Sequence, residues 1–188
     1  MKHFEKIILK DGRECLLRSP TEDDAAEVLR VFILTHGQTD NLLSYPDEIT
    51  FGIEEEAAFL KKRAESPDET EIVAFVDGRA AGTAGIDRVG KCRKVRHRAS
   101  FGIGVDSEYW GLGIGRALTL ACIESAKEAG YSQLELEVVA SNGRAMGLYR
   151  SLGFAEYGRN PLGFLTRSGE TQELIMMRLD LRPGKSAQ

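Results

Sequence analysis

Hydrophobic and polar positions alternate with a period of two in some segments and follow a helical period in others. Asp11-Gly12 and Asp77-Gly78 each separate two short apolar runs, and Asp-Gly is a preferred dipeptide of tight hairpin turns. Apolar residues from Ala25 to Ile33 recur at the spacing of one helix face, after a helix start near Thr21. The pattern predicts strands at 4–10, 13–18, 72–76, 80–89, 99–105, 133–139, from 154, and at 173–181, and helices from 21 and at 53–64, 114–129 and 144–152.

The order of these segments changes in the middle of the chain. Up to residue 105 the strands follow one another as antiparallel hairpins do. Beyond it the order becomes strand, glycine loop, helix, strand, which is a βαβ unit with parallel strands covered by helices. We therefore expect an α/β (α+β) fold: one mixed, mostly antiparallel twisted sheet of about six to seven strands with a central parallel pair, flanked by about four helices.

Length and composition fit one compact domain. The chain has 188 residues, of which 42% are hydrophobic and 29% charged. We expect a single domain over residues 1–181 and a frayed tail at 182–188. The net charge of -4 argues against nucleic acid or an anionic membrane as a partner. Because no apolar run resembles a signal peptide or a membrane span, we expect a cytoplasmic location.

The cysteines and histidines show no spacing typical of a metal site. The cysteines are odd in number, and both residue types are scattered along the chain: Cys15, Cys92, Cys122, His3, His36 and His97. We therefore expect neither a disulfide framework nor a bound metal.

A glycine-rich loop links the strand ending at Val105 to the helix beginning near Ile114. Gly111, Gly113 and Gly115 alternate there. Glycines at a helix entrance let backbone N–H groups converge on one point, and the helix dipole adds partial positive charge. The loop is therefore suited to a phosphate or pyrophosphate. A turn serving only close packing of helix and strand remains the alternative.

Two other phosphate-binding motifs do not fit this spacing. A dinucleotide fingerprint that began at Gly111 and Gly113 would need its third glycine at Arg116. A Walker A loop ending in Gly184-Lys185-Ser186 would need an upstream glycine at Leu179. Both mismatches weigh against a nucleotide- or flavin-linked enzyme.

Trp110 to Leu118 resembles the acetyl-CoA loop of the GNAT superfamily of N-acetyltransferases. The family pattern is Gln or Arg, two residues, Gly, one residue, and Gly or Ala. Trp110 stands where Gln or Arg is usual. Because backbone N–H groups make most ligand contacts in that loop, we expect this departure to change side-chain packing more than anion binding.

A second segment, Asn142 to Phe154, resembles the other signature of the family: Asn, a short helix with Leu148-Tyr149, then Gly153-Phe154. Its residues also suit a helix capped by Ser141 or Asn142 and ended by Gly153. By periodicity alone, Tyr149 is a packed core residue. The resemblance implies that its hydroxyl protonates the departing CoA thiolate as a general acid.

Acyl transfer also needs a base, because an ammonium ion cannot attack a thioester. Alternation in the strand 133–139 places Glu135 and Glu137 on one face. A solvated face is one interpretation, and an opening lined with charge is the other, since both faces are usually covered in a βαβ context. The stretch from Glu137 to Tyr149 resembles ribosomal-protein N-terminal acetyltransferases, which implies that Glu137 is the base, with Glu135 as its substitute.

The resemblance assigns the remaining roles. Acetyl-CoA would be the co-substrate, held by Ile103, Val105, Gly111, Leu112, Gly113, Ile114, Gly115, Arg116, Asn142 and Tyr149. Glycines 102 and 104 would permit a bulge where the strands part. The acetyl group would pass directly to a primary amine of a small molecule or to a peptide N-terminus. The resemblance also makes a homodimer possible. A CoA-binding regulatory module without turnover is the alternative.

The acceptor site carries no recognisable motif. We expect it to be shaped by Phe32, by 41–45, by Glu54 to Glu56, and by a long loop at 157–167.

Overall fold

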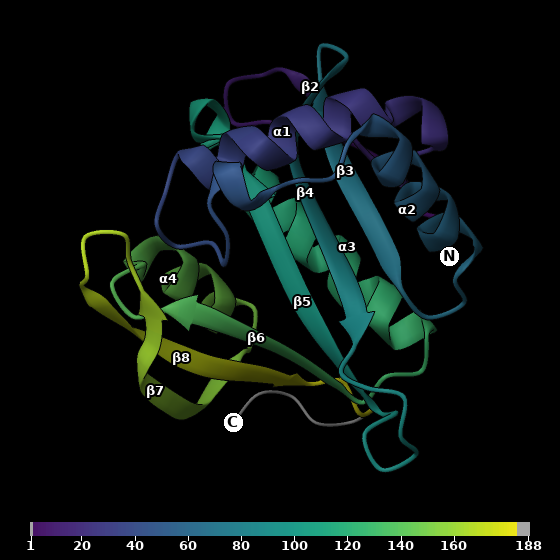
Figure 1. Ribbon diagram of the computed structural model, residues 1–188. Coiled ribbons are helices and arrows are strands. Elements are labelled where there is room, and N and C mark those ends of the chain that lie inside the picture. The colour runs from purple at the N-terminus through teal and green to yellow at the C-terminus, as the bar shows by residue number, and fades with distance from the viewer. Residues whose placement is uncertain (1, 184–188) are drawn as a thin grey trace.

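The computed structural model describes residues 2–183, which form one eight-stranded sheet with helices on both faces (Figure 1). The strand order is β1-β2-β3-β4-β5-β6-β8-β7, and the pair β5–β6 is parallel while the other six pairs are antiparallel. The elements are β1 (Phe4–Ile8), β2 (Glu14–Arg18), α1 (Ala25–Gly37), α2 (Ile53–Glu65), β3 (Thr70–Val76), β4 (Arg79–Arg88), β5 (Arg98–Val105), α3 (Ile114–Glu128), β6 (Gln133–Val139), α4 (Gly143–Ser151), β7 (Ala155–Leu165) and β8 (Thr171–Asp180).

Local sequence accounts for the first elements. Gly12, Asp77 and Gly78 adopt φ angles of 89°, 51° and 79°, so the two Asp-Gly turns use the left-handed backbone that favours these residue types. The predicted start of α1 is also present: the Asp24 carboxylate accepts the Thr21 backbone N–H at 2.7 Å. A turn of 3-10 helix precedes the α-helical part. Both hairpins and the helix start are confirmed.

Helices α1 and α2 lie on one face of the sheet and α3 on the other (Figure 1). Two apolar clusters result. The larger one includes Ile72, Leu118 and Leu134, between the sheet and α3, and the smaller one includes Val28 and Leu60, beneath α1 and α2. Ile114, Leu118, Ala121 and Cys122 of α3 belong to the larger cluster.

Strands β5 and β6 pair only over a short stretch. Their register runs from Arg98–Gln133 to Ser100–Glu135, and beyond it the strands diverge (Figure 1). The rest of β5 stays paired with β4 as far as Gly82–Val105. Residues 101–105 of β5 therefore have no strand on their other side, and a cleft opens there.

Three expectations were wrong. The sheet has eight strands, not six to seven. Residues 157–165 belong to β7 and are not a long loop, because pairing with β8 overrides the loop-like residues between them; two register shifts absorb the irregularity. The glycines of β5 cause no bulge, since the pairing of β4 with β5 is regular from end to end. Most of the tail expected at 182–188 lies outside the described residues.

Candidate active site

A cleft of about 1190 Å³ fills the gap between the diverging strands. Its walls are the free edge of β5, the glycine loop, β6 and the start of α4. Nine of the ten residues expected to hold the co-substrate line it: Ile103, Val105, Gly111, Gly113, Ile114, Gly115, Arg116, Asn142 and Tyr149. Leu112 does not, because its side chain packs on the core and its carbonyl accepts the Lys10 N–H at 3.2 Å.

The glycine loop has the conformation that an anion site requires. Gly111 and Gly113 have φ angles of 82° and 108°, which are strained for any residue with a Cβ, although a Cβ there would touch no other atom. Gly113 is the N-cap of α3, a helix of 15 residues. Because glycine has no side chain, it cannot accept hydrogen bonds from the free N–H groups of the first turn as a capping side chain would. The geometry fits the pyrophosphate of CoA, whose oxygens accept such N–H groups.

Trp110 has a defined role at the mouth of the loop. Its indole N–H donates to the Val105 carbonyl at 2.7 Å, and the Arg144 guanidinium lies 4.9 Å from the ring centroid. The residue that departs from the family pattern thus connects β5, the glycine loop and α4. That it changes packing more than anion binding stays a prediction.

Asn142 and Tyr149 are placed by α4. The Asn142 side chain caps this helix by accepting the Ala145 N–H at 3.2 Å. Tyr149 is buried, with its ring 6.2 Å from Phe101 and 5.8 Å from Phe154, and burial raises the pKa of its hydroxyl to about 12. The hydroxyl is therefore protonated at neutral pH.

The two acids of β6 have different environments. Glu135 is buried and forms a two-pronged ion pair with Arg98, one bond measuring 2.7 Å, and it also accepts from Gln133 and Tyr157. The Arg98 hydrogen bonds lower the pKa of this carboxyl. Glu137 is exposed in the cleft without such a partner. Glu137 is therefore more available than Glu135 to accept a proton from a ligand in the cleft.

Glu137 and Tyr149 approach the cleft from opposite faces of the sheet. Leu136 and Val138, the neighbours of Glu137, belong to the same apolar cluster as Tyr149, so alternation directs Glu137 to the other face. A group held in the gap between β5 and β6 has one of these side chains on either side.

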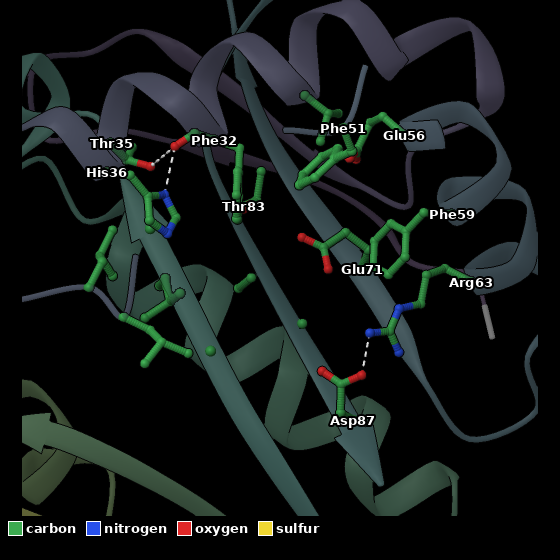
Figure 2. Close-up of a pocket in the computed structure, with 18 of the residues that line it drawn as sticks. Phe32, Thr35, His36, Phe51, Glu56, Phe59, Arg63, Glu71, Thr83 and Asp87 are labelled. Carbon is green, nitrogen blue, oxygen red and sulfur yellow. Dashed lines mark hydrogen bonds and ion pairs between the residues drawn. The ribbon is translucent and has the colours of Figure 1, made fainter. Parts of the chain in front are cut away.

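A second cavity, of about 510 Å³, adjoins the cleft on the side of α1 and α2 (Figure 2). The two hollows share Thr35, residues 42–43 and residues 102–104. Its floor is made of small residues, since Gly85 on β4 pairs with Gly102 on β5. A Cβ on Gly85 would lie 2.5 Å from Oε2 of Glu71, so this carboxylate occupies the space that a side chain there would fill.

Part of this cavity was expected from the sequence. Phe32, the residues 42–43, Glu55 and Glu56 line it, whereas Glu54 is exposed and does not. Glu71 was missed, because an acid at the edge of an apolar strand looks like an ordinary solvent-facing position. The glycines of β4 and β5 were the available signal.

The family follows from comparison with known proteins. A sequence profile of the Acetyltransferase (GNAT) family matches residues 38–154, which is more than half of the chain. The chain belongs to the GNAT family of acetyltransferases. This family uses acetyl-CoA, and the family resemblance and the mixed sheet expected from the sequence are thereby confirmed.

Individual relatives of this GNAT protein share parts of its sequence. The ribosomal protein bS18-alanine N-acetyltransferase of Escherichia coli (strain K12) is 41% identical over 76 residues, 40% of this chain and 51% of that protein. The N-alpha-acetyltransferase RimI of Mycobacterium tuberculosis is 37% identical over 102 residues, 54% of this chain and 61% of that protein. The chain thus spans between half and two thirds of the length of these curated relatives.

Solved structures match over nearly the whole GNAT chain. An acetyltransferase of the GNAT family from Streptococcus pneumoniae has a TM-score of 0.84 at 29% identity, covering 88% of this chain and 99% of that one. The Salmonella typhimurium protein yncA, solved with acetyl-CoA, has a TM-score of 0.80 at 19% identity, covering 93% and 98%. The second likeness concerns the fold alone.

The described part of the GNAT chain contains neither a membrane-spanning helix nor a cluster of metal-ligating side chains. Within residues 2–183, no helix is long and apolar enough to cross a membrane. In the same range, no three or more His, Cys, Asp or Glu side chains are grouped so as to hold a metal ion.

Proposed function

We propose that this protein transfers the acetyl group of acetyl-CoA directly to a primary amine, with Glu137 as the base and Tyr149 as the acid. One observation carries the proposal: these two side chains line the same cleft as the glycine loop and the free edge of β5. CoA would place its pyrophosphate at the glycine loop and its pantetheine arm along residues 103–105. The thioester would then lie in the gap between β5 and β6.

The reaction balances with these two residues alone. Glu137 takes a proton from the acceptor ammonium, directly or through water, and the free amine nitrogen attacks the acetyl carbonyl carbon. A C–N bond forms, the C–S bond breaks, and the Tyr149 hydroxyl gives its proton to the thiolate, while the nitrogen of the new amide loses its second proton to water. Exchange with water restores both groups. The two buried cysteines, Cys15 and Cys122, have thiol pKa values raised by burial, to about 11 for Cys15, which disfavours a covalent acyl-enzyme route.

The acceptor is a small amine or the N-terminus of a peptide. Relatives named as a ribosomal-protein alanine N-acetyltransferase and an N-alpha-acetyltransferase support the peptide, and the cavity beside the cleft supports a small amine. A cytoplasmic location is part of the same proposal.

Release of free thiol from acetyl-CoA tests the proposal, with a panel of alanine-starting peptides and small primary amines as acceptors. We expect release with at least one member of the panel. The Glu137→Gln and Tyr149→Phe variants are each expected to lower kcat by about two orders of magnitude, with CoA affinity nearly unchanged.

A tyrosine and a glutamate outside the cleft lining provide matched controls. Tyr131 is buried in the same apolar cluster but lies outside the cleft lining, and Glu128 is exposed at the end of α3. Tyr131→Phe and Glu128→Gln should retain wild-type rates. Measurable CoA binding with no thiol release for any amine would instead favour the regulatory module without turnover.

A further inference from the structure

The cavity beside the cleft combines apolar walls with unmatched acids. Its apolar wall comes from Val28, Phe32, Leu42, Leu43, Phe51 and Phe59. Four carboxylates line it, those of Glu55, Glu56, Glu71 and Asp87, against the single guanidinium of Arg63. With His36 neutral, the lining carries a formal charge of -3.

Arg63 offsets the charge of Asp87 but leaves the three glutamates of the lining without an ionic partner in the described chain. Its guanidinium donates to Asp87 and to the Ile86 carbonyl at 3.4 Å, and it lies 3.5 Å from Glu69 (Figure 2). His36, on α1, uses Nδ1 for the Phe32 carbonyl at 2.7 Å. Neither cation-forming residue is paired with Glu71.

Two carboxylates are left without an ionic partner. Glu56 is 6% exposed, lines the cavity, and has neither a hydrogen bond nor an ion pair among the described residues. The Glu71 carboxylate extends over Gly85, with no cation within 4 Å in the described chain, and the more distant charge of Arg63 only partly counters the effect of burial on its pKa. Burial raises the pKa of both carboxyls, that of Glu71 to about 7. Glu56 is buried and Glu71 half-buried, and carboxylates at this depth without an ionic partner favour a cationic ligand.

We propose that the cavity binds an acceptor with a second positive group, separated from the reacting amine by an alkyl or aromatic chain, and that Glu71 and Glu56 bind that group. The inference rests on the proposed function, because it takes the adjoining cleft as the site of transfer. The phenylalanine walls contact the chain between the two charges. The substrate class is therefore a diamine or another amine with a distant cation.

Binding without turnover tests this directly. The protein is saturated with CoA, which carries no acetyl group, and linear α,ω-diamines of three to eight carbons are titrated by calorimetry at pH 8. Each is compared with the monoamine and with the ω-amino acid of equal length. For at least one length we expect the diamine to bind at least about tenfold more tightly than the monoamine, and the amino acid to bind most weakly. Equal affinities at every length would overturn the proposal.

Charge-removing variants then locate the interaction. Glu71→Gln and Glu56→Gln should each reduce the preference for the diamine to below about threefold. Glu54 is on the same helix as Glu56 but outside the cavity, so Glu54→Gln should keep the preference for the diamine. A purely structural role of the two acids predicts a lower Tm for both variants, whereas removal of an unpaired buried charge predicts an equal or higher Tm. A preference that survives both substitutions would overturn the assignment.

Thiol release separates this inference from the proposed function. A protein that binds diamines through Glu71 and Glu56 but releases no thiol from acetyl-CoA supports the inference and contradicts the function. Acetylation of monoamines and diamines at equal kcat/KM supports the function and contradicts the inference.

Discussion

The cleft and the cavity that adjoins it treat buried acids in opposite ways. In the cleft, Glu135 is held by Arg98, and its pKa is lowered. In the cavity, Glu71 and Glu56 have no cation of their own, and their pKa values are raised. The cleft therefore satisfies the charge of its buried acid within the protein, while the cavity leaves the charges of Glu71 and Glu56 to be satisfied by a ligand.

This difference teaches where each part of the specificity resides. The cleft presents mainly backbone groups and a closed ion pair, so it suits a ligand recognised by N–H donors, as a pyrophosphate is. The cavity presents side-chain carboxylates among phenylalanines, so it suits a ligand recognised by charge. Apart from the two proposed catalytic residues, substitutions in the cleft should disrupt folding or donor binding, and substitutions in the cavity should change the acceptor.

The largest expected effect comes from removing the cation that pairs with the buried acid of the cleft. Arg98→Met leaves Glu135 buried without its cation, and an unpaired buried charge is strongly destabilising. We expect the free energy of unfolding at pH 7 to fall by about 2 to 3 kcal/mol, measured by urea denaturation. The pKa of Glu135, followed by NMR, should rise.

The exposed pair of Arg159 and Glu156 on β7 provides the control. Arg159→Met removes a similar ion pair whose members face solvent, so it should cost about 1 kcal/mol or less. Equal losses for the two variants would contradict the claim that Glu135 depends on its partner because it is buried.

A smaller effect is expected from the backbone of the glycine loop. Gly113→Ala forces a residue with a Cβ to adopt a φ of 108°, which should cost about 1 to 2 kcal/mol and weaken CoA binding about tenfold, measured by urea denaturation and calorimetry. Gly147→Ala is the matched control: this glycine is exposed within α4, where alanine should stabilise the helix by up to about 1 kcal/mol. A loss of affinity in both variants would argue against a specific role for the loop.

The same contrast decides what could be predicted from the sequence. The cleft includes two segments whose residues are close together in the chain, the glycines from Gly111 to Gly115 and the segment from Asn142 to Phe154, so spacing predicted an anion site and the family resemblance supplied the expected roles. The cavity depends on Glu71 lying over Gly85, and on α2 covering both. Only the folded sheet brings these positions together. The periodicity of β3 marks Glu71 as polar without saying that it is enclosed.

Strand β7 was mispredicted for a related reason. Asn160-Pro161 and Gly163 are local signals of a loop. In the fold they lie where the pairing of β7 with β8 shifts register, between Asn160 and Phe164, and strand pairing continues on both sides. Long-range pairing therefore outweighed local preference.

The smallest expected effect concerns the pH dependence of stability, and it tests the cavity side of the comparison. Because the pKa of Glu71 is raised to about 7 in the folded protein, the native state binds more protons than the unfolded state between about pH 4.5 and 7. The contribution of Glu71 to stability therefore falls as pH rises through this window, and above it the ionised carboxylate is destabilising. Glu71→Gln should raise the free energy of unfolding by about 1 kcal/mol at pH 8 and by almost nothing at pH 4.

Urea denaturation of the variant and the wild type at both pH values measures this difference, and pH effects common to the two proteins cancel. Glu54→Gln, which removes an exposed charge, should show no such pH-dependent gain. A saturating diamine should abolish the gain, because bound cation stabilises the ionised wild type and not the glutamine variant. If Glu71→Gln is instead destabilising at pH 8, then Glu71 is already satisfied within the protein, and the contrast between the cavity and the cleft fails.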